Sequence, residues 1–152
     1  MRMLRTLVGS GDKVALFALP FIVVAAILAV AGAPMLELGV APPWLPALSI
    51  AVLVTGLVIW LWSVVLIVTN VPQGRLITTG PYALVRHPLY TAVALLVLPW
   101  IGFLLGTWLG VLIGGALYGG SRIFAPEEEA SLSRTFGDAW RDYSASVRLR
   151  WL

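Results

Sequence analysis

The chain has 152 residues, of which 60% are hydrophobic and only 11% are charged. Soluble domains carry about a quarter charged residues, so this composition, with a mean hydropathy of +0.96, indicates an integral membrane protein. The absence of cysteine excludes disulfides and thiolate chemistry, and a single histidine with seven carboxylates argues against a metal site. The formal net charge is only +3, and nothing in the sequence supports nucleic-acid binding.

The first half of the chain predicts two membrane-spanning helices. Residues 14–34 form an uncharged run that can cross a bilayer core of roughly 30 Å at about 1.5 Å per residue. A cleaved secretory signal is the alternative, with Ala29-Val30-Ala31 as the cleavage site, but the apolar run is longer than a typical signal core. After a proline-rich connector, residues 46–69 form a second uncharged run, with Pro46 suited to its first turn.

Two further membrane helices are predicted over residues 88–105 and 107–124, after a polar loop. Pro99 is expected to kink the first of these helices. The second carries glycines that repeat at helical spacing. They can allow close packing or dimerisation through a face of small residues, or they can open a groove for a bulky ligand. These glycines are Gly106, Gly110, Gly114, Gly115 and Gly119.

The distribution of positive charge predicts the orientation in the membrane. Lysine and arginine occur in the N-terminal tail, in the loop between the second and third helices and in the C-terminal part of the chain. Cytoplasmic segments of membrane proteins are enriched in these residues. We therefore expect one multi-pass membrane domain over residues 1–152, with both termini and the 70–87 loop in the cytoplasm.

Residues 126–152 are predicted to form an amphipathic cytoplasmic helical segment that lies on the membrane or against the bundle. Gly137 is expected to divide it into two helices, with Asp138 capping the second. Acidic residues at the start of a helix commonly interact with the helix dipole. Glu128, however, lies four residues before the first residue of the apolar stripe and therefore on the same helix face, where a carboxylate needs a partner. The stripe consists of Leu132, Phe136, Trp140, Tyr143 and Val147.

Polar chemistry also concentrates in residues 80–90, which read GPYALVRHPLY. Pro88 suits the first turn of a helix, where a missing N–H is tolerated. His87 is therefore expected at the helix N-cap, where unpaired N–H groups and partial positive charge favour an anion or a polar ligand. Taken alone, Arg86 could be a charge that extends to the membrane interface and His87 a simple cap.

Two blocks of the sequence resemble the integral-membrane methyltransferases that include isoprenylcysteine carboxyl methyltransferase and phosphatidylethanolamine N-methyltransferase. The first block, GPY at residues 80–82 and RHPLY at residues 86–90, is similar to the family's GPY and RHPxY. The second, residues 128–147, is similar to EExxLxxxFGxx(Y/W)xxYxxxV. Ala92 and Arg148 depart from the usual glycine and proline, which weakens assignment to a subfamily more than to the family.

The resemblance implies S-adenosylmethionine as the methyl donor, bound at the cytoplasmic side. It implies cofactor contacts at His87, Pro88, Tyr90, Glu128 and Glu129, and catalytic roles for Arg86, Glu128 and Arg122, without a metal. Methyl transfer from a sulfonium mainly requires alignment and exclusion of water. An amine acceptor must first lose a proton, for which His87 or a glutamate is the available base, whereas a carboxylate or thiolate needs no base.

These patterns together predict an all-α integral membrane methyltransferase with a bundle of four transmembrane helices and a C-terminal amphipathic segment. Its acceptor is expected to be lipophilic and to enter from the bilayer, as an isoprenylcysteine-type carboxylate, a thiol or a phospholipid amine. The expected partners are this substrate, membrane lipids and a second copy bound through the glycine-rich helix. The alternatives are a non-catalytic membrane assembly protein and an NADPH enzyme of the sterol reductase type, against which the compact Glu128-Glu129 block argues.

Overall fold

The computed structural model describes residues 11–32 and 36–149, and the regular elements of this part of the chain are helices, without a strand. The expected all-α class is therefore confirmed. The long helices are α2 (Gly11–Val30), α3 (Leu45–Asn70) and α6 (Leu109–Phe136), and α7 (Asp138–Ser146) is shorter. Between α3 and α6, α4 (Pro88–Thr91), the π-helical η4 (Ala92–Val97) and α5 (Leu98–Leu104) follow one another without a break. Two short turns, η2 (Val71–Gln73) and η3 (Gly80–Ala83), lie in the loop before α4.

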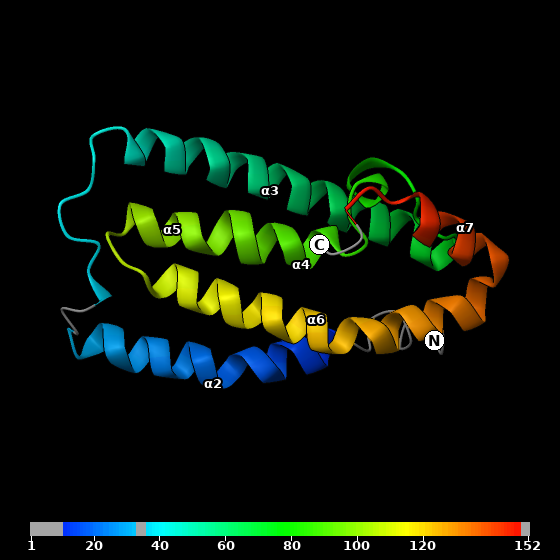
Figure 1. Ribbon diagram of the computed structural model, residues 1–152, viewed down its shortest axis with the longest axis horizontal. Coiled ribbons are helices and arrows are strands. Elements are labelled where there is room, and N and C mark those ends of the chain that lie inside the picture. Colours follow the sequence, from blue (N-terminus) through cyan, green and yellow to red (C-terminus); the bar gives the residue numbers. More distant parts are fainter. Residues whose placement is uncertain (1–10, 33–35, 150–152) are drawn as a thin grey trace.

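The helices lie side by side in the order α3, α4–α5, α6, α2, and α7 packs at one end (Figure 1). Helix α6 packs against α2 on one side and against η4 and α5 on the other, while α3 packs against η4 and α5. Within the described part of the chain, α2 and α3 make no comparable contact with each other. The arrangement is therefore a layer with α2 and α3 at its edges, and the expected bundle of four transmembrane helices stays a prediction.

Two helices are long and apolar enough to cross a membrane, Asp12–Val30 and Leu45–Gln73, and Pro88–Leu104 is a shorter apolar helix. Large apolar side chains on α2 and α3 point outward, as expected for surfaces covered by lipid. Helix α2 begins three residues earlier than predicted and ends at Val30, because the chain turns at Gly32 with a φ of 62°. The predicted end of this helix at Pro34 lies outside the described residues, as do Arg2 and Arg5, two of the positive charges of the N-terminal tail.

The π-helical segment Ala92–Val97 ends just before Pro99. A proline has no N–H for the carbonyl four residues earlier, and its ring crowds that carbonyl. The wider turn of a π-helix relieves this conflict without ending the helix. The irregularity expected at Pro99 thus takes the form of a widened turn, and the chain remains helical from Pro88 to Leu104.

Two glycines of α6 allow its backbone to contact the backbone of the preceding helical segment directly. A Cβ atom on Gly110 would overlap the carbonyl oxygen of Leu98, and one on Gly114 would overlap that of Ala94. Gly115 and Gly119 have no neighbouring atom within 4 Å of such a Cβ. Close packing within the chain therefore accounts for Gly110 and Gly114, and the predicted dimerisation of α6 can use only the other face.

Helix α6 continues through Pro126 to Phe136, although the sequence suggested separate helices on either side of this proline. One missing hydrogen bond does not end a helix whose neighbouring turns are intact. The break after Phe136 lies at Gly137, as predicted, with φ 54° and ψ −122°. Gly137 also occupies the N-cap position, so the prediction that Asp138 caps α7 is wrong. Asp138 instead accepts a hydrogen bond from Arg141 at 3.1 Å.

Gly110→Ala and Gly115→Ala should have opposite effects on stability. The first substitution forces α6 away from Leu98 and should lower the free energy of unfolding by about 1–3 kcal/mol. The second adds a methyl group in open space and should leave stability unchanged or raise it by up to about 1 kcal/mol. Thermal unfolding of the purified variants in detergent measures both effects. Equal effects of the two substitutions would contradict the packing described here.

Candidate functional site

The polar residues of the 80–90 segment are placed by the end of α3 and the start of α4. Gly80 has a φ of 63°, and a Cβ on it would lie 3.0 Å from the ring of Trp62 on α3. The turn therefore packs tightly against α3. Pro88 is the first residue of α4 and is fully buried, and His87 occupies the N-cap position. Both placements agree with the expectation from the sequence.

Arg86 connects three segments that are distant in the sequence. Its Nη1 donates hydrogen bonds to both carboxylate oxygens of Glu129 on α6 at 3.1 Å, and its Nη2 donates to the backbone carbonyl of Ser144 on α7 at 3.0 Å. The two charged side chains are only 19% and 26% exposed. Charge-assisted hydrogen bonds of partly buried groups are stronger than those of surface ion pairs. This pair therefore fixes the 80–87 loop against both C-terminal helices.

His87 lies between the two glutamates and is 10% exposed. Its Nδ1 is 4.0 Å from Glu128 Oε2, and its Nε2 is 3.5 Å from Glu129 Oε1. The second distance is at the limit of a hydrogen bond, and the buried Nε2 has no closer partner in the described part of the chain. Interactions with His87 and then with Arg86 lower the pKa of Glu129 below its usual 4.5, against the opposing effect of burial. The Glu129 carboxylate is therefore charged at neutral pH.

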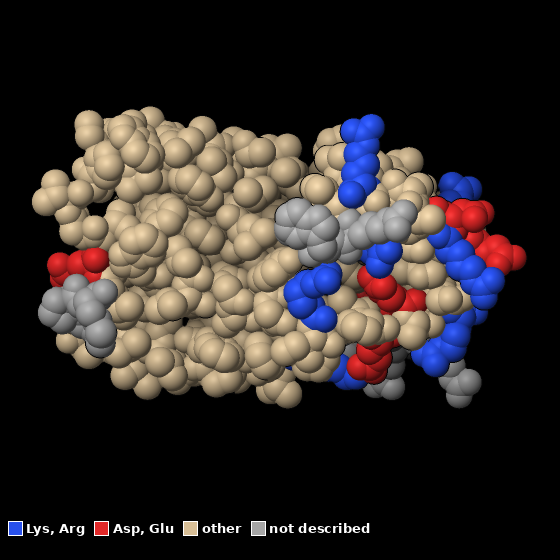
Figure 2. Space-filling view, in the orientation of Figure 1, with Lys and Arg blue, Asp and Glu red and all other residues tan. Residues whose placement is uncertain are grey.

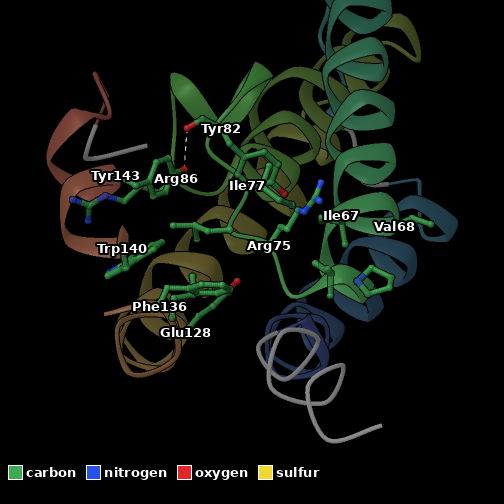
Figure 3. A pocket seen from close by; sticks show the side chains of 14 residues that line it. Ile67, Val68, Arg75, Ile77, Tyr82, Arg86, Glu128, Phe136, Trp140 and Tyr143 are labelled. Atoms are coloured by element: carbon green, nitrogen blue, oxygen red, sulfur yellow. Dashed lines mark hydrogen bonds between the residues drawn. The ribbon is translucent and has the colours of Figure 1, made fainter. Parts of the chain in front are cut away.

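A cavity of about 370 Å³ lies beside this cluster (Figure 3). The end of α3 and the loop after it form one wall, and the end of α6 with α7 forms the other. Figure 3 shows Tyr82 near Tyr143 and Arg86, and Glu128 close to Phe136. The lining residues are Ile67, Val68, Val71, Pro72, Arg75, Leu76, Ile77, Tyr82, Arg86, Glu128, Leu132, Phe136, Trp140 and Tyr143.

The apolar stripe predicted from the sequence forms the α6–α7 side of this cavity. Trp140, Tyr143 and Val147 are buried in one cluster, against which Leu76, Tyr82, Leu132 and Phe136 pack. The hydroxyl of Tyr143 donates to the carbonyl of Tyr82 at 2.9 Å. Burial raises the pKa of Tyr143 to about 12 and raises that of Tyr82 as well, so both phenols stay protonated at neutral pH.

A second, smaller cavity of about 100 Å³ adjoins the Arg86–Glu129 pair. It is lined by Arg86, Arg122, Ala125, Pro126 and Glu129. Arg122 is exposed and lines only this smaller cavity. Arg86 thus lines both cavities, and Glu129 lines the smaller one.

The structure brings together most of the residues that the sequence singled out. Arg86, His87, Glu128 and Glu129 form one cluster, and Arg122 lies at its polar side. Pro88 is the first residue of α4, and His87, Pro88 and Tyr90 are not among the residues that line either cavity.

Sequence reasoning missed the contribution of the end of α3 and of Arg75, which lie outside both sequence blocks. The loop after α3 packs against the α7 cluster through Leu76 and Tyr82, and this contact between distant segments has no local sequence pattern.

The model of the isoprenylcysteine carboxyl methyltransferase (ICMT) family matches residues 45–133, which is more than half of the chain. The chain therefore belongs to this family of membrane methyltransferases. The matched region extends from α3 into the last turns of α6 and includes Arg86, His87, Glu128 and Glu129. No curated protein and no solved structure matches the chain.

Glu129→Gln should destabilise the protein, because it leaves the partly buried charge of Arg86 without a counter-charge. We expect a loss of about 1–3 kcal/mol in the free energy of unfolding at neutral pH, measured by thermal unfolding in detergent. Asp138→Asn is the matched control, since Asp138 forms an ion pair with Arg141 in which the two side chains are 89% and 75% exposed. Breaking so exposed an ion pair should change stability little. A Glu129→Gln variant as stable as this control would contradict the role given to the ion pair.

The same substitution should alter the response to acid. Because the folded protein lowers the pKa of Glu129, its contribution is present above the usual value of 4.5 and is lost as the pH falls through the lower folded-state pKa. The difference in stability between wild type and Glu129→Gln should therefore shrink in this acidic range. A difference that is constant from neutral pH into this range would show that the charge of Glu129 is not involved.

Proposed function

We propose that the protein transfers a methyl group from S-adenosylmethionine to a lipophilic acceptor. The observation that carries this proposal is the convergence of Arg86, His87, Glu128 and Glu129 beside an apolar cavity, in a chain that belongs to a methyltransferase family. The proposed catalytic residues are Arg86, Arg122 and Glu128.

The residues around the larger cavity fit this cofactor. A volume of about 370 Å³ lies in the range of roughly 300–1,000 Å³ typical of small-molecule sites. Aromatic walls suit both an adenine ring and a cationic sulfur, and the carboxylate of Glu128 can bind an ammonium group or ribose hydroxyls. When bound, S-adenosylmethionine supplies a methyl group activated by a positively charged sulfur. The proposed cofactor-binding residues are His87, Pro88, Tyr90, Glu128 and Glu129.

The chain's own residues would act mainly by orienting the reactants and excluding water. Helix α7 covers the cavity and is held there by Arg86 and by the hydroxyl of Tyr143. His87 or Glu128 would accept a proton from an amine acceptor. Arg122 and Arg86 line the small polar cavity, which suits the polar group of an acceptor.

The acceptor is proposed to enter from the bilayer. Val68 at the end of α3 lines the cavity and is 65% exposed on the surface of an apolar helix. This placement supports a lateral opening toward lipid. A carboxylate, a thiol or an amine at the end of a lipophilic chain all remain candidates for the methyl-accepting group.

The two alternative functions differ in the cofactor that they require. A sterol-reductase-like enzyme would bind NADPH, whose phosphates need several cationic partners. Arg75 and Arg86 are the cations that line the larger cavity, and Arg86 is already paired with Glu129. A non-catalytic assembly protein would bind no cofactor.

We also propose that the chain crosses the membrane four times as one domain, with both termini and α7 in the cytoplasm. The described lysines and arginines lie at the end that carries α7 (Figure 2). The ion pair of Lys13 with Glu127, at 2.6 Å, places the start of α2 at this end, whereas Glu37 pairs through its backbone with Thr107 at the opposite end. The positive-inside rule supports a cytoplasmic location for the basic end.

A homodimer would use the exposed face of α6 that carries Gly115 and Gly119.

Because the chain has no cysteine, single introduced cysteines can test this orientation. Ala139→Cys on α7 should react with a membrane-impermeant maleimide only from the cytoplasmic side. Leu105→Cys, in the turn at the other end where the side chain is 74% exposed, should react only from outside. Labelling of intact cells and of inverted vesicles distinguishes the sides. Reaction of both cysteines from the same side would overturn the proposed topology.

Calorimetric titration tests the proposed cofactor directly. The purified protein should bind S-adenosylmethionine and not NADPH. Glu128→Gln and His87→Ala should weaken binding by about tenfold or more, since Glu128 lines the cavity and His87 Nδ1 lies 4.0 Å from its carboxylate. Glu127→Gln is the control, because Glu127 pairs with Lys13 and does not line the cavity.

Binding of NADPH alone would favour the reductase, and binding of neither compound would favour an assembly protein. Unchanged affinity for the methyl donor in both Glu128→Gln and His87→Ala would show that the site is misplaced. Transfer of a labelled methyl group into a lipid extract would then identify the acceptor.

A further inference from the structure

The larger cavity has three charged side chains in its lining, Arg75, Arg86 and Glu128. Arg86 is already engaged, because it donates to Glu129 and to the carbonyl of Ser144. The guanidinium of Arg75 has no hydrogen bond or ion pair with any residue that the structure describes. Arg75 is therefore the cation of this cavity that remains available to a ligand.

The position of Arg75 is fixed by the residues on either side of it. Gly74 turns the chain with a φ of 66°, and the N–H of Arg75 donates to the carbonyl of Asn70 in the last turn of α3 at 3.2 Å. Leu76 packs into the cluster of Trp140 and Tyr143. The backbone of Arg75 is thus held between α3 and α7, and only its side chain is free to adjust.

Arg75 and Glu128 come from opposite walls of the cavity. Figure 3 shows Arg75 beside Ile67 and Ile77, on the side of α3, and Glu128 beside Phe136, on the side of α6. A ligand that fills the space between them would meet a positive group on one wall and a negative group on the other. This distribution suits a molecule that carries both a carboxylate and hydrogen-bond donors.

We propose that Arg75 binds the carboxylate of S-adenosylmethionine, while Glu128 binds its ammonium group or ribose hydroxyls. This inference rests on the proposed function, which supplies the cofactor. A carboxylate transferred into an apolar cavity needs a counter-charge, and the planar guanidinium of arginine matches carboxylate geometry. The sequence analysis expected the start of α4 at His87 to favour an anion, and the neighbouring charge of Arg86 is neutralised by Glu129.

The test compares S-adenosylmethionine with its decarboxylated analogue by calorimetric titration of the full-length protein in detergent. Wild type should bind S-adenosylmethionine more tightly than the analogue. Arg75→Gln should weaken binding of S-adenosylmethionine by about tenfold or more, the size expected for a charge-assisted contact. The same variant should bind the analogue within about twofold of wild type, so its preference for the carboxylate disappears. Arg75→Lys should retain part of the preference because it keeps the charge.

Arg134→Gln is the matched control, since it removes an exposed arginine from the same end of the molecule without touching the cavity. It should leave both affinities unchanged. Thermal unfolding of each variant checks that the fold is intact.

The inference is overturned if Arg75→Gln binds S-adenosylmethionine as tightly as wild type, or if it loses affinity for both compounds equally. A wild type that binds both compounds equally well would also overturn it while leaving the proposed cofactor intact. A wild type that binds neither compound would instead remove the proposed function, and this inference with it.

Discussion

The ion pair between Arg86 and Glu129 is the interaction on which the rest of the candidate site depends. Two charges that are less than a third exposed lose much of their hydration, and such a pair is stable only when its remaining hydrogen-bonding groups are also satisfied. The carbonyl of Ser144 satisfies part of Arg86 and thereby brings α7 into the same arrangement. Since Glu128 precedes Glu129 on α6, the pair also sets the position of Glu128 beside His87 and the cavity.

This ion pair can form only because α6 reaches the 80–87 loop as one continuous helix. Gly110 and Gly114 hold the first half of α6 against the backbone of the preceding helix. The unbroken helix through Pro126 then carries both glutamates along the same axis to the level of His87. A break near residue 125 would have uncoupled the glutamates from the packing that positions α6. Backbone contact at one end of the molecule therefore helps to determine side-chain geometry at the other.

Local features of the fold were predicted from the sequence more successfully than longer-range ones. Pro88 at a helix start and Gly137 at a helix break follow from backbone chemistry at single residues, and both were predicted correctly. The continuity of α6 through Pro126 was not, because a proline inside a helix is tolerated only when the surrounding packing compensates. The order of the helices in the layer and the place of Arg75 on the cavity depend on contacts between distant segments, for which no local pattern exists.

The two walls of the larger cavity differ in how they relate to the family. The match to the family model ends at residue 133, after the charged cluster of Arg86, His87, Glu128 and Glu129. Phe136, Trp140 and Tyr143, which form much of the aromatic wall, lie beyond it. The matched region therefore supplies the charges and the apolar wall at the end of α3, while the C-terminal segment adds the aromatic side chains of the opposite wall. Arg86 holds α7 through the backbone carbonyl of Ser144, so this contact does not depend on an α7 side chain, whereas the contact to the Tyr82 carbonyl is donated by the cavity-lining side chain of Tyr143 itself.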